Sequence, residues 1–281
     1  MRRLSLATSW GELLLVGGSR AGESSLVLLP QLRLALDAGR PARALVPMQH
    51  VVVSHGHLDH LLGLPAWASQ RNLQGIRGGD VLTPRSLSAD VVQLLDLCAR
   101  LEGGSPYDVN VRPVAAGDVV QLRRDFRLRF FATSHWVETL GCCLEWVRPR
   151  LRAELVGLPP DRLRRLRREG EPISDLHVVP LVAYLADTGP ETLEREEWLA
   201  ETEVLIVECT FLRPSDLDRA RRFGHVHLDD LVAAGPRLRN RHVVLTHLSR
   251  RHRLSEGNRR IRKALRPVIA SELHLLNEEW E

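Results

Sequence analysis

Four side chains of the kinds that bind metal ions lie within six positions of one another: His55, His57, Asp59 and His60. Imidazole nitrogen and carboxylate oxygen suit zinc, and manganese or iron accept them too. Burying three imidazoles and a carboxylate without a metal would leave many polar atoms unpaired. Because four ligands so close in sequence do not surround one tetrahedral ion without strain, the spacing favours two ions that share the motif.

The residues on either side predict how this motif is held. Val51, Val52 and Val53 are β-branched and predict a buried strand. Residues 61–67 are mostly apolar and predict the start of a packed helix. A rigid strand that ends in a turn fixes the backbone, and the turn directs the ligands into one cleft.

Four later apolar runs also end in residues that can bind a metal or a proton: His135, Asp187, Glu208 and His247. His225 follows Glu208 near the start of a predicted helix. Each of these signals is weak alone.

The stretch Ser54-His-Gly-His-Leu-Asp-His-Leu-Leu-Gly-Leu-Pro65 resembles the signature of the metallo-β-lactamase superfamily. It is most similar to the ribonuclease Z branch, whose members trim the 3′ end of precursor tRNA. The later strand-end residues occur in that family's order. The resemblance implies a single α/β domain over residues 1–281, an αββα four-layer sandwich with two mixed sheets face to face.

The resemblance also implies a role for each site residue. It assigns His55, His57 and His135 to one zinc ion and Asp59, His60 and His247 to the other, with Asp187 bridging them. Water activated by the two ions would attack the phosphodiester, with Asp59 holding or deprotonating it. Glu208 would orient His225, which would protonate the leaving oxygen. Manganese or iron could replace zinc.

Some positions depart from the family pattern. Ala186 replaces a glycine, Cys209 an alanine, and Val226 a small hydroxyl residue. The glycine-rich opening of the family is poorly matched. An alternative therefore stays open, a hydrolase with the same metals and a small substrate such as a cyclic nucleotide, an aryl sulfate or another small ester. A metal-binding RNA module without turnover is disfavoured because every catalytic position is filled.

Residues 148–176 differ from the rest of the chain in composition. Pro149, Pro159, Pro160 and Pro172 are expected to break regular structure, and residues 161–168 predict a short basic helix. Ribonuclease Z enzymes insert a tRNA-binding arm at this place, so we expect a reduced substrate-binding arm. A solvated arginine face is the equal alternative.

The whole chain sets broader limits. It has 281 residues, 44% of them hydrophobic, and a formal charge of +4, which does not by itself imply nucleic acid. Four cysteines without a C-x-x-C spacing predict reduced thiols and a cytoplasmic protein. No apolar run approaches the length of a membrane span. The resemblance implies precursor tRNA as a partner and a homodimer.

Three smaller expectations complete the sequence analysis. Asp37 is a candidate for supporting the site, although a turn-forming role is favoured. His227 is expected on the surface of a helix. Residues 256–265 predict an outer helix, and residues 271–281 end the chain.

Overall fold

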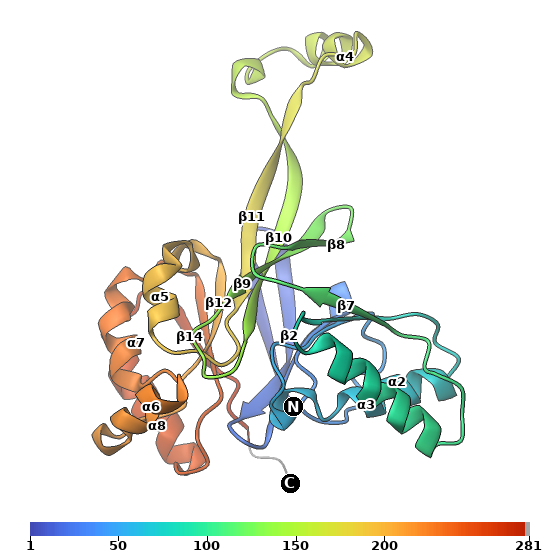
Figure 1. The fold of residues 1–281 in the computed structure, drawn as a ribbon. Helices are drawn as coiled ribbons and strands as arrows, with labels where there is room; N and C mark the ends of the chain where they lie inside the picture. The colour runs from blue at the N-terminus through green and yellow to red at the C-terminus, as the bar shows by residue number, and fades with distance from the viewer. Residues whose placement is uncertain (279–281) are drawn as a thin grey trace.

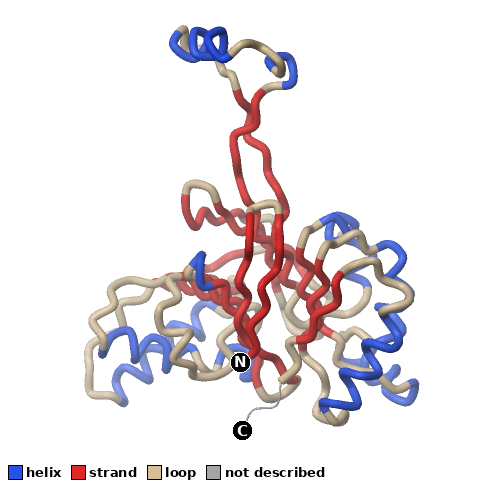
Figure 2. Tube along the Cα trace, turned by 180° about the vertical axis from the view of Figure 1, so that it is seen from behind, coloured by secondary structure: helices blue, strands red, loops and turns tan. Residues whose placement is uncertain are grey.

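Two seven-stranded mixed sheets form the centre of the molecule. The computed structural model describes residues 1–278; residues 279–281, the end of the predicted terminal segment, lie outside the described residues. The strand orders are β1-β2-β3-β4-β5-β6-β7 and β14-β13-β12-β11-β10-β9-β8. Helices lie on the outer side of each sheet (Figures 1 and 2), so the predicted α/β four-layer arrangement is confirmed.

The first sheet carries the predicted metal motif. It is antiparallel from β1 to β4 and parallel from β4 to β7. Its strands are β1 (Arg2–Thr8), β2 (Gly11–Arg20), β3 (Ser24–Leu29), β4 (Leu34–Leu36), β5 (His50–Val52), β6 (Asp80–Pro84) and β7 (Asn110–Val114). The helices on this side are α1 (Leu58–Leu61), α2 (Leu64–Leu73) and α3 (Ser88–Leu101). Helix α3 buries Val91, Leu95 and Ala99, which share one face because they are four residues apart.

The second sheet is antiparallel from β8 to β11 and parallel from β11 to β14. Its strands are β8 (Val119–Arg123), β9 (Phe126–Ala132), β10 (Leu140–Leu151), β11 (Ser174–Tyr184), β12 (Val204–Glu208), β13 (His242–Thr246) and β14 (Glu272–Leu275). The helices on this side are α5 (Glu191–Arg195), α6 (Leu217–Phe223), α7 (Leu228–Ala234) and α8 (Leu254–Leu265). Short 3₁₀ turns are η1 (Pro30–Leu32), η2 (Ala153–Leu155), η3 (Glu197–Glu201), η4 (Pro214–Asp216) and η5 (Gly235–Arg237).

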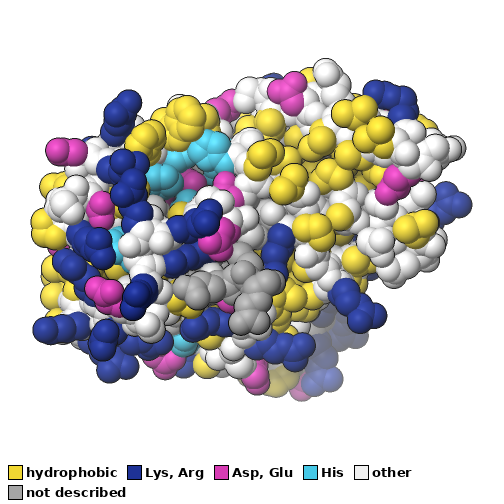
Figure 3. All heavy atoms as spheres, turned by 90° about the horizontal axis from the view of Figure 1, so that it is seen from below, with side chains coloured by type: hydrophobic (Ala, Val, Ile, Leu, Met, Phe, Trp, Pro, Cys, Tyr) yellow, Lys and Arg dark blue, Asp and Glu magenta, His cyan; other side chains and the backbone are white. Residues whose placement is uncertain are grey.

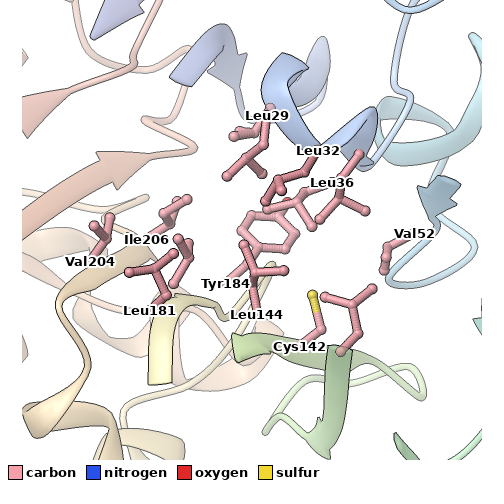
Figure 4. Close-up of a cluster of buried hydrophobic side chains, with 14 of the residues drawn as sticks. Leu29, Leu32, Leu36, Val52, Cys142, Leu144, Leu181, Tyr184, Val204 and Ile206 are labelled. Atoms are coloured by element: carbon pink, nitrogen blue, oxygen red, sulfur yellow. The ribbon is translucent and has the colours of Figure 1, made fainter. Parts of the chain in front are cut away.

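A core of aliphatic side chains lies between the two sheets. Figure 4 shows Leu29 and Leu36 of the first sheet facing Leu144, Leu181 and Ile206 of the second. Two further clusters lie between each sheet and its outer helices. The core fixes the two sheets against each other, and the strand ends that carry the predicted ligands are held with it.

Strands β10 and β11 extend far beyond the rest of their sheet. They pair from Cys142 and Tyr184 to Leu151 and Ser174, whereas β9 leaves β10 at Trp146. The resulting hairpin projects from the body and carries α4 (Pro160–Arg168) near its tip (Figure 1). We call residues 148–176 the arm.

The expectation that Pro149 breaks the chain is wrong, because Pro149 lies within β10 opposite Leu176. A two-stranded ribbon has free edges, where a missing backbone donor is tolerated.

Other sequence expectations concern the cysteines and the membrane. All four cysteines are unpaired, and Cys142, Cys143 and Cys209 are buried. Burial raises the pKa of all three thiols, which makes them poor nucleophiles. Within residues 1–278, the structure contains no helix with the length and apolar character needed to cross a membrane.

Candidate metal centre

The seven predicted ligands meet at one edge of the paired sheets. Each follows the end of a strand: the motif at residues 55–60 follows β5, His135 follows β9, Asp187 follows β11 and His247 follows β13. Figure 3 shows histidine side chains exposed together on the face opposite the arm, with basic side chains beside them. The sheets therefore bring together residues that are nearly 200 positions apart.

The ligand atoms form two groups with Asp187 between them. One atom each of His55, His57, His135 and Asp187 lies within 4.8 Å of the others, and Asp59, His60 and His247 form a second such group. Asp187 Oδ2 is 3.7 Å from His55 Nε2 and 3.9 Å from His135 Nε2. Asp187 Oδ1 is 3.4 Å from His60 Nε2 and 3.3 Å from His247 Nε2. Each carboxylate oxygen thus faces one group.

Hydrogen bonds on the outer side of the site fix the tautomers of four of these histidines. His60 Nδ1 donates to Asp37 over 2.6 Å and His135 Nδ1 to the Gly224 carbonyl over 2.9 Å. Ser54 donates its hydroxyl proton to Asp37, so its oxygen accepts from His55 Nδ1 over 2.9 Å.

Thr210 completes the pattern around the fourth histidine. Its hydroxyl proton goes to Glu208, so its oxygen accepts from His247 Nδ1 over 3.1 Å. In all four rings the Nε2 lone pair is left pointing into the site, which is the arrangement that metal-binding histidines require.

Buried atoms without partners indicate that a cation fits this site. His55 Nε2, His135 Nε2 and Asp187 Oδ1 are buried and accept no hydrogen bond. Burial lowers the pKa of His55 well below its usual value, which keeps its ring in the neutral, metal-binding form. Although burial opposes ionisation of Asp187, the nearby histidines hold its pKa well below the usual range. The unpartnered ring nitrogens of His55 and His135 and the ionised Asp187 are costly to bury unless a cation joins them.

Asp37 supports the site, so its interpretation as a turn former was wrong. It is completely buried, and Tyr184 donates its hydroxyl proton to Oδ2 over 2.6 Å. The Ser54 amide donates to Oδ1 over 2.8 Å. Together with the bond from His60, these contacts lock the carboxylate that orients one predicted ligand.

The structure brings the predicted acid pair together beside the two ligand groups. His225 Nδ1 donates to Glu208 Oε1 over 2.7 Å, and the Thr188 amide donates to the same oxygen over 2.8 Å. The His225 ring centre lies 5.0 Å from that of His135 and 5.5 Å from that of His247. Burial alone would lower the pKa of His225, but the Glu208 carboxylate outweighs it and raises that pKa to about 9. His225 is therefore held as a proton donor at neutral pH.

Two backbone positions within or next to the ligand set are strained. Ala186 has φ of 53° and His247 has φ of 62°, both in the left-handed region. Glycine adopts this region without cost. This explains why the ribonuclease Z signature has a glycine where this chain has Ala186. Both residues flank or form the ligand set, a common place for such strain.

Sequence reasoning missed Trp136 and misjudged His227. The Trp136 side chain is 62% exposed, and its ring centre lies 5.3 Å from that of His57. It lines a cleft of about 260 Å³ with His135 and Arg222. In the sequence, only the position of Trp136 next to a strand-end histidine could have indicated that it lies beside the ligands. His227 is fully buried rather than on the surface, because its ring caps the start of α7.

Comparison with known proteins gives three kinds of similarity. The sequence model described as "Beta-lactamase superfamily domain" matches residues 21–248. The chloroplastic tRNase Z TRZ2 of Arabidopsis thaliana is 30% identical over 263 residues, which are 92% of this chain and 74% of that protein. The ribonuclease Z of Shouchella clausii is 28% identical over 262 residues, 84% of this chain and 81% of that protein.

The solved structure of human tRNase Z, short form, shares the fold. It superposes with a TM-score of 0.60 at 16% identity and covers 93% of this chain and 95% of that one. The metallo-β-lactamase fold protein YhfI of Bacillus subtilis has a TM-score of 0.64 at 14% identity, covering 95% and 96%.

Proposed function

This chain belongs to the beta-lactamase superfamily and to its ribonuclease Z branch, and from that premise we propose that it cleaves precursor tRNA near the 3′ end with the help of two zinc ions. The predicted resemblance is confirmed, and the protein is a metal-dependent hydrolase, a phosphodiesterase of tRNase Z type. The alternative of a small ester substrate is not favoured, since the matching relatives are named for tRNA processing.

The convergence of four Nε2 lone pairs on the Asp187 carboxylate is the observation that carries the metal assignment. We assign one zinc ion to His55, His57 and His135, and the other to Asp59, His60 and His247, with Asp187 shared. When bound, such ions supply positive charge that acidifies water and offsets the charge growing on phosphate oxygens. Zinc suits this nitrogen-rich set better than magnesium or calcium, which prefer oxygen ligands.

Two groups of the chain then handle the protons. Asp59 Oδ2 accepts the Gly22 amide over 2.7 Å and faces His247 at 3.4 Å, so its carboxylate is fixed at the site. We assign it to orient the attacking water and take up its proton. His225, charged through its bond to Glu208, gives a proton to the leaving oxygen. Because the completely buried Glu208 carboxylate accepts from His225 Nδ1, it holds the His225 ring in one orientation.

The arm is assigned to hold the body of the RNA. Residues 148–176 contain eight arginines and five acidic residues. Arginine binds phosphate in a bidentate way, and the release of counterions favours such contacts without base specificity. The solvated arginine face that the sequence left open is compatible with this role, since only exposed charges can reach a phosphate.

The direction of the arm favours a dimer. Strand β10 begins five residues after His135 and runs away from the site, and β11 returns to end three residues before Asp187. Strand β10 has twelve residues, which span about 40 Å at ~3.3 Å each. The arm of one copy thus points away from its own centre, and we propose a homodimer in which it serves the other centre. A cytoplasmic location stays a prediction.

Trp136 is assigned to receive a base beside the scissile bond. Its ring is exposed at the edge of the ligand group, and an aromatic face stacks on any base. Arg222 lines the same cleft and offers charge for a neighbouring phosphate.

The experiment that tests the function follows the metal and the RNA ends together. Protein freed of metal by chelation should not cut a 3′-extended precursor tRNA, and two or more equivalents of zinc should restore cleavage. His55→Ala should bind less zinc and stay inactive, whereas His177→Gln, in β11 outside the arm, should behave as wild type. Restoration by one equivalent would contradict the two-ion assignment, and products with random ends would contradict the tRNA assignment.

A further inference from the structure

A further group of possible ligands lies at the start of β13, at the end of the strand opposite His247. One atom each of His242, Glu272 and His274 lies within 4.8 Å of the others. His242 begins β13 and pairs with Glu272, the first residue of the neighbouring β14. His247 lies five residues further along, about 16 Å away at ~3.3 Å per residue. This cluster is therefore separate from the catalytic centre.

The strands present all three side chains on one face. Glu272 and His274 are two residues apart on β14, so they point to the same side of the sheet. His242, opposite Glu272 in the ladder, points to that side as well. Their proximity follows from the backbone register and does not depend on a loop.

The distances match those expected around one ion. His242 Nδ1 is 3.2 Å from His274 Nε2 and 3.3 Å from Glu272 Oε2, and His274 Nε2 is 3.7 Å from the same oxygen. Around tetrahedral zinc with bonds of ~2.0 Å, neighbouring ligand atoms lie about 3.3 Å apart. The two ring centres are 5.3 Å apart, the separation also found for His55 and His135 in the catalytic centre.

A backbone contact prepares one ligand. His242 Nε2 donates to the Ala7 carbonyl over 2.9 Å, so the lone pair of Nδ1 faces the other two groups. The His242 side chain is 2% exposed, that of His274 20% and that of Glu272 70%. The cluster is thus buried at His242 and open to solvent at Glu272, where water can complete the coordination. Without a metal, His274 Nε2 would donate its proton to His242 Nδ1, and the cluster would be a plain hydrogen bond.

We propose that His242, His274 and Glu272 form a peripheral site for a divalent cation of the zinc type. The site joins β14 to β13. Strand β14 has four residues, stands at the edge of its sheet and, within residues 1–278, forms a ladder with β13 alone. Through Ala7 of β1, the same cation supports the contact between the two sheets. Arg262 adds positive charge near His274, so the Glu272 carboxylate is needed to balance the ion.

The test counts zinc in variants that spare the catalytic centre. Protein freed of metal by chelation is dialysed against buffered zinc, and the zinc-to-protein ratio is measured for wild type, His274→Gln and Glu272→Gln. His177→Gln removes a histidine from β11 outside the arm and is the matched control. Far-ultraviolet circular dichroism and cleavage rate confirm that each variant is folded, and both should be unchanged.

We expect His274→Gln to bind one equivalent less than wild type and the control to match wild type. Glu272→Gln should bind the extra equivalent about tenfold more weakly or lose it. If His274→Gln and Glu272→Gln both bind as much zinc as wild type, with equal affinity, the proposal is wrong and the cluster is a hydrogen bond only. His274 and Glu272 are partly exposed, so neither variant depends on repacking the core.

Discussion

Removing the tip of the arm is predicted to separate RNA binding from chemistry. Leu151 and Ser174 are the last paired residues of β10 and β11, so residues 152–173 can be replaced by Asn-Gly, a two-residue turn that closes such a pair. The shortened protein keeps both sheets, every proposed ligand and the His225–Glu208 pair. Its rate on a chromogenic phosphodiester should therefore equal that of wild type.

The expected loss of RNA affinity follows from the charges on α4. This helix carries five arginines, of which Arg164 and Arg165 form exposed ion pairs with Asp161 and Glu169. Within residues 1–278, the other three form no ion pair, which leaves them for phosphates. Each phosphate contact contributes about 0.7–0.9 to the slope of log affinity against log salt, so the slope should fall by about 2–3.

The assay is binding of a precursor tRNA by filter retention or fluorescence anisotropy at 50 to 200 mM salt. Over this range the loss of affinity should be about 15 to 60 times larger for wild type than for the shortened protein. Arg162→Ala combined with Arg167→Ala and Arg168→Ala should reproduce the change without altering the backbone. An unchanged slope together with an unchanged KM for precursor tRNA would refute the assignment of the arm.

Three other substitutions test the site and its support. Trp136→Ala should raise the KM for precursor tRNA about 5- to 100-fold by removing one stacked base, with no change on the small diester; an equal loss on both substrates would count against stacking. Gly141→Ala places a Cβ 2.5 Å from the Phe131 ring and 2.8 Å from the Tyr184 carbonyl, so urea unfolding should show a loss of about 1–3 kcal/mol, and full stability would contradict this packing. Tyr184→Phe removes the hydroxyl that donates to Asp37. It should lower the free energy of unfolding by about 1–2 kcal/mol and weaken zinc binding. Unchanged zinc affinity would mean that this contact does not help Asp37 to orient His60.

The positions of the site residues at strand ends were predictable, because each of them directly follows an apolar run in the sequence. The run before His247 is a completely buried strand, and the run before His135 is a strand whose buried residues alternate with half-buried ones over most of its length. What the sequence alone could not show is the hydrogen bonding on their outer side. Thr210, for example, links Glu208 to His247, and no spacing rule connects these positions.

The errors have a common physical origin, since they depend on surroundings supplied by distant segments. Aspartate is common in turns, but Tyr184 of the opposite sheet donates a hydrogen bond to Asp37, whose carboxylate is a buried acceptor. His227 was expected on the surface of a helix, yet its ring caps the start of α7, a role that serine or aspartate fills more often.

The arm was underestimated because its strands lack the apolar alternation of a core strand. Both faces of the ribbon beyond Trp146 meet solvent, so no face needs to be apolar, and the prolines suggested a loop. Pairing between β10 and β11 is specified by the register that begins at Cys142 and Tyr184 inside the sheet. The hairpin then continues outward.

The most direct test of the proposed function compares wild type with His225→Ala on a 3′-extended precursor tRNA, with bound zinc counted in both proteins. Loss of a positioned general acid should lower the rate about 10²- to 10⁴-fold while the zinc content stays the same. Wild type should cut near the 3′ end of the mature tRNA sequence. If His225→Ala keeps the full rate, or if wild type hydrolyses only a small diester, the assignment of the Glu208–His225 pair to RNA cleavage is contradicted.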